Sequence, residues 1–88
     1  MYNVDFTEAA RKDVIILKSK APNAFKKLVK ILPELEQHPR TGTGQCEQLK
    51  HYKEETWSRR LDKRHRLVYR IYDEDVEVLV VSAFGHYE

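Results

Sequence analysis

The spacing of apolar residues changes near the middle of this chain, and this change restricts its possible folds more than any other sequence feature. Between residues 8 and 35 apolar side chains recur at intervals of three and four, as on one face of a helix. From residue 57 onward they alternate with polar side chains, as in strands with one buried face. Helices followed by strands are typical of an α+β domain. With 88 residues, the chain is expected to form a single domain over residues 1–88.

The first half is predicted to contain one short strand and two helices. The strand is indicated by three apolar residues that alternate with polar ones: Tyr2, Val4 and Phe6. Thr7 is expected to cap a helix over residues 8–20, and Pro22 suits the first turn of a second helix. Pro33 lies inside this second helix, where it removes a hydrogen bond and clashes with the preceding turn. A kink or a restart is therefore expected at Pro33.

The second half is predicted to form three strands. Residues 57–61 and 66–71 alternate as a hairpin with its turn at residues 62–65. The near-continuous apolar run from 76 to 83 suits a central strand that is covered on both faces. The acidic residues 73–75 are interpreted as a turn rather than a metal site, because consecutive residues point in different directions. The expected order is β-α-α-β-β-β, with two helices packed on an antiparallel-rich sheet.

Composition excludes several classes of protein. The chain is 41% hydrophobic and 34% charged, as in soluble globular proteins. Its longest apolar runs, at 14–17 and 78–81, are far below the roughly 20 residues that cross a bilayer. The first residues lack a secretory signal, so the cytoplasm is the expected compartment. A single cysteine, Cys46, excludes an internal disulfide and a cysteine metal cluster, and it gives only weak support for a thiol nucleophile.

Charge is distributed unevenly along the second half. Residues 59–70 contain six basic residues and one acid, a net charge of +5. Residues 71–88 contain five acids and no lysine or arginine. A basic face of this kind suits a polyanion such as nucleic acid. A solvated hairpin is the alternative interpretation.

Four short blocks follow one another in a set order: Glu47-x-Leu49-Lys50-His51, Trp57-Ser58-Arg59-Arg60-Leu61, His65-Arg66-Leu67-Val68-Tyr69 and His86-Tyr87. Their order and spacing resemble the YoeB/Txe branch of the RelE toxin superfamily. The resemblance implies a RelE-like microbial RNase fold and cleavage of messenger RNA in the ribosomal decoding site, without a cofactor. It also implies neutralisation by a cognate antitoxin of the YefM type. A homodimer is possible.

The resemblance places the family's catalytic residues at four positions: Glu47, Arg66, His86 and Tyr87. RNA cleavage without a metal requires a base for the ribose 2′-hydroxyl and an acid for the departing 5′-oxygen, the roles expected of Glu47 and His86. Arg66 is expected to stabilise the charge that develops on the phosphate, and Tyr87 to position the RNA. Four further residues are secondary candidates for holding the RNA backbone: Lys50, His51, Arg59 and Arg60.

Each assignment has a structural alternative. Glu47 lies in a polar stretch and suits an ordinary surface residue, whereas Arg66 and Arg60 suit ion pairs across the hairpin. Trp57 and Tyr69 are expected to pack in the sheet rather than stack on bases. The two remaining histidines are expected to be structural or exposed: His38 and His65.

The chain also departs from the family pattern. The glycine usual before the tryptophan is absent from residues 52–56, Phe84-Gly85 stands where Arg-Tyr is common, and Glu88 extends the terminus. A different class of function therefore stays open, in which the protein blocks the ribosome, or gyrase as the related ParE toxins do, by binding alone.

Overall fold

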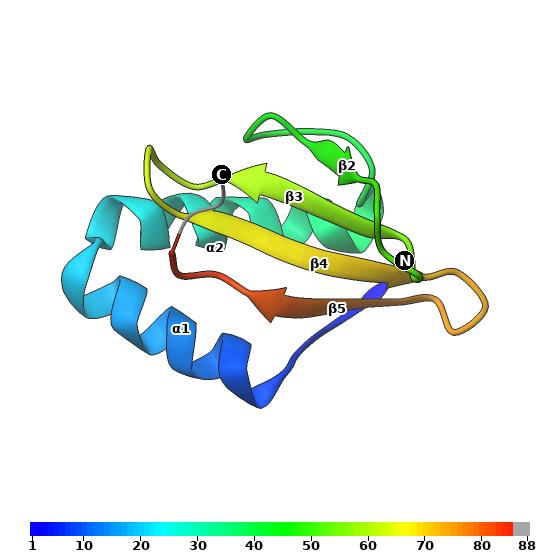
Figure 1. The fold of residues 1–88 in the computed structure, drawn as a ribbon, viewed down its shortest axis with the longest axis horizontal. Coiled ribbons are helices and arrows are strands. Elements are labelled where there is room, and N and C mark those ends of the chain that lie inside the picture. Colours follow the sequence, from blue (N-terminus) through cyan, green and yellow to red (C-terminus); the bar gives the residue numbers. More distant parts are fainter. Residues whose placement is uncertain (86–88) are drawn as a thin grey trace.

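The fold consists of two helices packed against one face of a five-stranded sheet (Figure 1). The computed structural model describes residues 1–85. The elements in chain order are β1 (Asn3–Phe6), α1 (Glu8–Lys20), α2 (Pro22–Gln37), β2 (Glu47–Leu49), β3 (Thr56–Arg60), β4 (Arg66–Tyr72) and β5 (Glu77–Ser82). The strand order is β1-β5-β4-β3-β2, with β1 parallel to β5 and all other neighbours antiparallel. The α+β class is confirmed.

Local sequence signals placed both helices correctly. The Thr7 hydroxyl accepts a hydrogen bond from the backbone N–H of Ala10 at 3.0 Å, which caps α1 as expected. The second helix begins at Pro22, where a missing N–H costs nothing because first-turn N–H groups have no helical partner. A restart at Pro33 is wrong, since α2 continues to Gln37. Buried residues on either side of Pro33 hold the helix against the sheet, so packing overrides local preference. A kink there stays a prediction.

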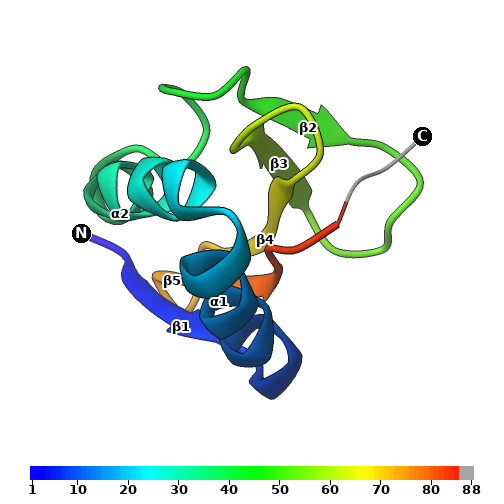
Figure 2. The same ribbon diagram turned by 90° about the vertical axis from the view of Figure 1, so that its left-hand side faces the viewer.

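The sheet differs from expectation in two respects. The short strand β2 was not predicted, because three residues are too few to establish an alternating pattern. The expected position of β5 inside the sheet is confirmed, since β5 lies between β1 and β4, but its expected cover on both faces is wrong. Along β5 only Val78 and Val80 are fully buried. Neither helix covers the opposite face (Figure 2), so an apolar run did not require burial on both faces.

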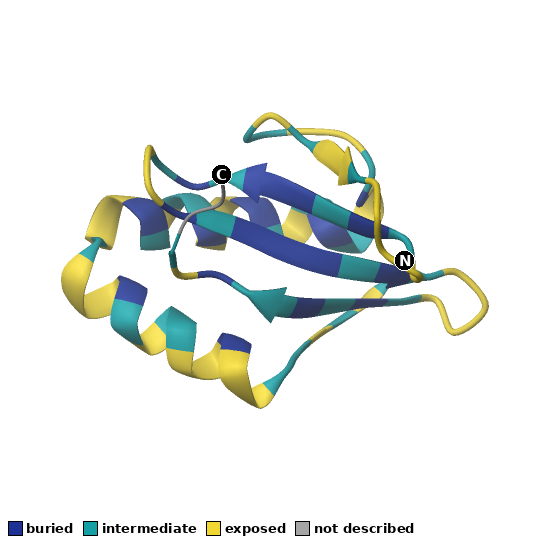
Figure 3. Cartoon of the chain, viewed as in Figure 1, coloured by how far each residue is buried: buried dark blue, intermediate teal, exposed yellow. Residues whose placement is uncertain are grey.

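The core lies between the helices and the sheet (Figure 3). Its largest fully buried aliphatic side chains come from both layers: Leu17, Leu28, Ile31, Leu35, Leu67, Val78 and Val80. Each such side chain stabilises the fold by about 1.5–3 kcal/mol relative to exposure. Tyr69 is fully buried and Trp57 packs against the same cluster, so their predicted packing role is confirmed. Within the described part of the chain, neither helix has the length and apolarity needed to cross a membrane.

Candidate functional site

Alternation along β3 sends two neighbouring arginines to opposite sides of the sheet. Arg59 faces the helices, where it contacts Glu34 of α2. Arg60 therefore faces the open side, and it pairs with Arg66 across the β3–β4 ladder. Ser58 lies on this open side too, opposite Glu47 of β2. Strand register alone thus gathers Glu47, Ser58, Arg60 and Arg66 on one face.

A cavity of about 310 Å³ opens on this face. Residues of β2, the loop after it, β3 and β4 line the cavity: Glu47, Leu49, Lys50, His51, Tyr52, Ser58 and Arg66. Four of the expected site residues are therefore brought together, namely Glu47, Lys50, His51 and Arg66.

An acid and a guanidinium face each other in the cavity. Glu47 Oε1 lies 3.8 Å from Arg66 Nη1, and the Glu47 side chain is 63% exposed whereas that of Arg66 is 23% exposed. Arg66 Nη1 also donates to Ser58 Oγ at 3.1 Å. The buried hydroxyl of Ser58 thus fixes the Arg66 guanidinium, while the Glu47 carboxylate stays accessible to a ligand. A loose, exposed ion pair of this kind adds little to stability.

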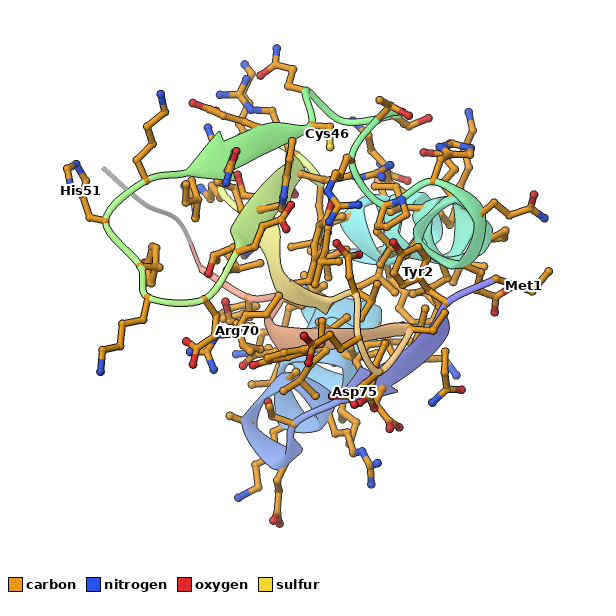
Figure 4. All side chains as sticks on the ribbon, turned by 90° about the vertical axis from the view of Figure 1, so that its right-hand side faces the viewer. Met1, Tyr2, Cys46, His51, Arg70 and Asp75 are labelled. Atoms are coloured by element: carbon orange, nitrogen blue, oxygen red, sulfur yellow. The ribbon has the colours of Figure 1, made fainter. Side chains whose placement is uncertain are left out.

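The loop after β2 carries two of the candidates for holding the RNA backbone. Lys50 and His51 are exposed, and Figure 4 shows His51 at the outer edge of this loop, on the side away from α2. The loop ends at Glu55, whose carboxylate accepts two hydrogen bonds from Arg40 at 2.7 and 2.9 Å and one from Trp57 at 2.7 Å. The hydrogen bond from Arg40 is the main cause that lowers the pKa of Glu55 below its usual value. These contacts anchor the end of the loop, and sequence reasoning did not find them.

Arg40 also joins the acidic turn after β4 to the N-terminus. Its Nη2 donates to Asp73 Oδ2 at 2.8 Å, and the hydroxyl of Tyr2 donates to Asp73 Oδ1 at 2.7 Å. The turn interpretation of residues 73–75 is confirmed. Among residues 1–85, no three His, Cys, Asp or Glu side chains are grouped as they would be around a metal ion.

Arg59 does not support its expected role in holding RNA. Its side chain has no exposed surface, and its guanidinium is bonded inside the fold to Glu34 and to the hydroxyl of Tyr69. The same group donates to three backbone oxygens of the loop after α2: His38, Pro39 and Thr41. The repeated Arg59-Arg60 pair gave no sign of this difference, because the side each residue faces depends on strand register.

The remaining expected residues have other locations. Arg60 is partly exposed beside the cavity but does not line it. His86, Tyr87 and Glu88 lie outside the described residues. The last described residue, Gly85, lies close to Arg66, whose backbone N–H donates to Gly85 O at 3.2 Å.

Two further residues are sequence neighbours of the expected site residues, and the sheet places them on opposite faces. Cys46, one residue before Glu47, lies on the helix side, where its thiol contacts the Tyr69 hydroxyl at 3.5 Å. This placement gives no support to a thiol nucleophile in the cavity. Ser58 was missed as a site residue, although its alternation with Arg59 placed it on the same face as Arg60.

Comparison with known proteins identifies the family. A family model described as the YoeB-like toxin of bacterial type II toxin-antitoxin systems matches residues 6–87. Toxin YoeB of Mycobacterium bovis is 32% identical over 87 residues, covering 99% of this chain and 100% of that protein. A YoeB dimer from Staphylococcus aureus has a TM-score of 0.82 at 27% identity and covers 98% of each chain. A heterotetrameric YoeB-YefM complex from Staphylococcus aureus has a TM-score of 0.79 at 27% identity and covers 99% of each chain. The chain therefore belongs to the YoeB-like toxin family of type II toxin-antitoxin systems, within the RelE/ParE structural superfamily.

Proposed function

We propose that this toxin cleaves messenger RNA on the ribosome, using acid–base chemistry on the ribose 2′-hydroxyl and no cofactor. The observation that carries the proposal is the meeting of Glu47 and Arg66 at 3.8 Å in an open cavity. Side by side on one wall of the cavity, the two groups suit a scissile phosphate, because one can take a proton while the other neutralises charge on the phosphate oxygens.

Glu47 is the base in this scheme. It removes the proton from the 2′-hydroxyl, whose oxygen then attacks the phosphorus as the bond to the 5′-oxygen breaks. His86 donates the proton that the departing 5′-oxygen requires, and Tyr87 positions the RNA. The products are a 2′,3′-cyclic phosphate and a free 5′-hydroxyl.

Arg66 stabilises the transition state through a guanidinium fixed in orientation. Its hydrogen bond to Ser58 aligns one edge before RNA arrives, which avoids reorganisation during the reaction. Lys50 and His51 line the same cavity, where the Lys50 ammonium supplies positive charge and the His51 ring supplies a hydrogen-bond donor for neighbouring phosphates. Arg60 extends this basic surface along β3.

The partners follow from the same proposal. The substrate is messenger RNA within a translating ribosome, so the toxin acts in the cytoplasm. A cognate antitoxin of the YefM type neutralises it, as suggested by the YoeB-YefM complex from Staphylococcus aureus. A homodimer is the corresponding proposal for the free toxin, since a relative was crystallised as a YoeB dimer.

The decisive experiment adds the purified toxin to translating ribosomes and maps the 5′ ends of the messenger RNA. New ends that carry a 5′-hydroxyl, and that disappear with Glu47→Ala, are expected. Stalled ribosomes on intact messenger RNA would instead indicate a binding inhibitor and refute the proposal. A model RNA treated with chelator tests the cofactor: cleavage should persist, and a specific requirement for added metal would contradict proton transfer by Glu47 and His86 alone.

A further inference from the structure

The end of the described chain is docked on the turn between β3 and β4. The backbone N–H of Gly85 donates to Nδ1 of His65 at 2.9 Å, and Gly85 O accepts from the N–H of Arg66 at 3.2 Å. The ring of Phe84 stacks on the His65 ring, with centroids 4.6 Å apart and planes at 29°. One histidine therefore contacts two successive residues immediately before residue 86.

His65 is itself rigidly held. The residue is only 9% exposed to solvent. Its backbone N–H donates to Asp62 Oδ1 at 2.7 Å, and its carbonyl accepts from the N–H of Leu61 at 2.9 Å. Because a backbone N–H can only donate, the Nδ1 atom that receives Gly85 carries the lone pair. The bound ring is consequently neutral, with its proton on Nε2.

Gly85 needs its glycine for conformation rather than for space. Its φ is +98°, and a Cβ added there would meet no atom within 4 Å. Only glycine adopts such a φ readily. In this conformation the N–H reaches His65 while the carbonyl reaches Arg66, so both polar groups of Gly85 are satisfied by the turn. The family pattern of Arg-Tyr at 84–85 would provide neither the glycine nor the Phe84 ring.

We propose that His65 is a positioning residue for RNA cleavage in this toxin. By anchoring Gly85 next to Arg66, it fixes the point of attachment of the segment that carries the proposed acid, His86. The proposal rests on the proposed function. It assigns His65 no proton transfer, and it explains why a nearly buried, neutral histidine lies directly before Arg66 in the sequence.

Two replacements separate the hydrogen bond from the stacking. His65→Phe keeps an aromatic ring against Phe84 but removes the acceptor. His65→Asn removes the ring but keeps an acceptor oxygen near the position of Nδ1. The exposed histidine His38 provides a matched control, His38→Phe, away from the cavity. Gly85→Ala disturbs the same contact from its other side without altering His65.

Three quantities are measured for each variant: the exchange rate of the backbone amide at position 85 by NMR, the ribosome affinity, and the single-turnover cleavage rate. His65→Phe and Gly85→Ala should expose the amide at position 85 to faster exchange. They should lower the cleavage rate roughly tenfold to hundredfold with unchanged affinity, because small displacements of a catalytic group have effects of this size. His65→Asn should retain most of the rate, and His38→Phe all of it.

Other outcomes have distinct meanings. Unchanged Gly85 exchange in His65→Phe would show that the anchor does not exist. Faster exchange with a normal cleavage rate would overturn the positioning role, as would equal loss of rate in His65→Phe and His65→Asn. If wild-type toxin cuts no better than Glu47→Ala, the proposed function itself fails, and the positioning role fails with it. If only the positioning role fails, the wild type still cleaves RNA and His65→Phe cleaves it at the same rate.

Discussion

Two arginine–glutamate pairs lie on opposite faces of the same sheet and have opposite characters. The Arg59–Glu34 pair faces the helices, with side-chain exposures of 0% and 21%. The Arg66–Glu47 pair faces solvent at 3.8 Å, with exposures of 23% and 63%. Identical chemical groups thus serve as an internal brace on one face and an accessible polar pair on the other. Burial, rather than residue type, separates the two.

The polar atoms of the buried pair are occupied by hydrogen bonds within the fold. Arg59 is bonded to Glu34, Tyr69 and loop carbonyls, while Glu34 also accepts from the N–H and hydroxyl of Thr43 at 2.9 and 2.7 Å. These bonds tie α2 to the loop that leads into β2, and β2 carries Glu47. The interior pair therefore supports the exposed pair through the loop, although it touches no part of the cavity.

Removing the exposed acid should have the largest effect on activity. Glu47→Gln keeps the size of the side chain but abolishes its basicity, so the cleavage rate should fall about 10² to 10⁴-fold in a single-turnover assay. Thermal stability should not change, because the ion pair is exposed. Glu54→Gln, at another exposed position that does not line the cavity around Glu47, is the matched control. A nearly normal cleavage rate in Glu47→Gln would show that the exposed pair does not provide the catalytic base.

Removing the buried arginine should chiefly affect stability. Arg59→Met leaves Glu34 without its cationic partner and several carbonyls without a donor, and breaking a buried pair in this way costs about 3–5 kcal/mol. The free energy of unfolding, measured in urea, should drop accordingly. Arg60→Met provides a neighbour on the open face, where a loss within about 0.5 kcal/mol is expected. Equal losses in the two variants would mean that the faces do not differ as described.

Ser58 tests whether the exposed arginine depends on a fixed orientation. Ser58→Ala removes the acceptor at 3.1 Å from Arg66 Nη1. Cleavage should slow about tenfold, which corresponds to about 1.4 kcal/mol in the barrier. Thr56→Val removes a hydroxyl on the same face that bonds to Glu54 O instead, so it should leave the rate unaltered. If both variants behave alike, the effect belongs to sheet packing and not to Arg66.

Arg60 should contribute to the salt dependence of RNA binding. If it contacts one phosphate, Arg60→Ala should flatten the slope of log affinity against log salt by roughly 0.7 to 0.9. Model RNA binding at several salt concentrations measures this slope. Lys20→Ala, on an exposed helix end, supplies a control for the general loss of one positive charge. An unchanged slope in Arg60→Ala would assign this arginine to the fold or to a protein partner.

The buried pair should also give stability a dependence on acid. Burial by itself would raise the pKa of Glu34, but hydrogen bonds from Thr43 and Arg59 outweigh it and lower the pKa. A carboxyl with a lowered pKa in the folded state stabilises the fold above its unfolded pKa of ~4.3, and this contribution is lost as the pH falls through the folded value. Urea unfolding between neutral and acid pH should show a smaller loss for Glu34→Gln than for wild type. Parallel curves would contradict a linked Glu34.

Sequence reasoning was most accurate where structure depends on neighbours in the chain. The cap at Thr7 and the start of α2 at Pro22 follow from local hydrogen bonding and backbone geometry. The hairpin of β3 and β4 follows from alternation over enough residues to fix its period. It was least accurate for β2, for the continuity of α2 through Pro33, and for the burial of β5, all of which depend on contacts between distant elements.

For the site, the sequence by itself determined the family resemblance and the supply of groups: an acid at Glu47, a guanidinium at Arg66 and a run of positive charge. Only the tertiary structure decided which arginine enters the interior and which faces the cavity, because side-chain direction in a strand reverses with each residue. It also decided that Ser58 holds Arg66 and that Arg40 anchors the loop at Glu55. These contacts join residues on separate strands and loops, and their formation depends on register and packing that no single segment specifies.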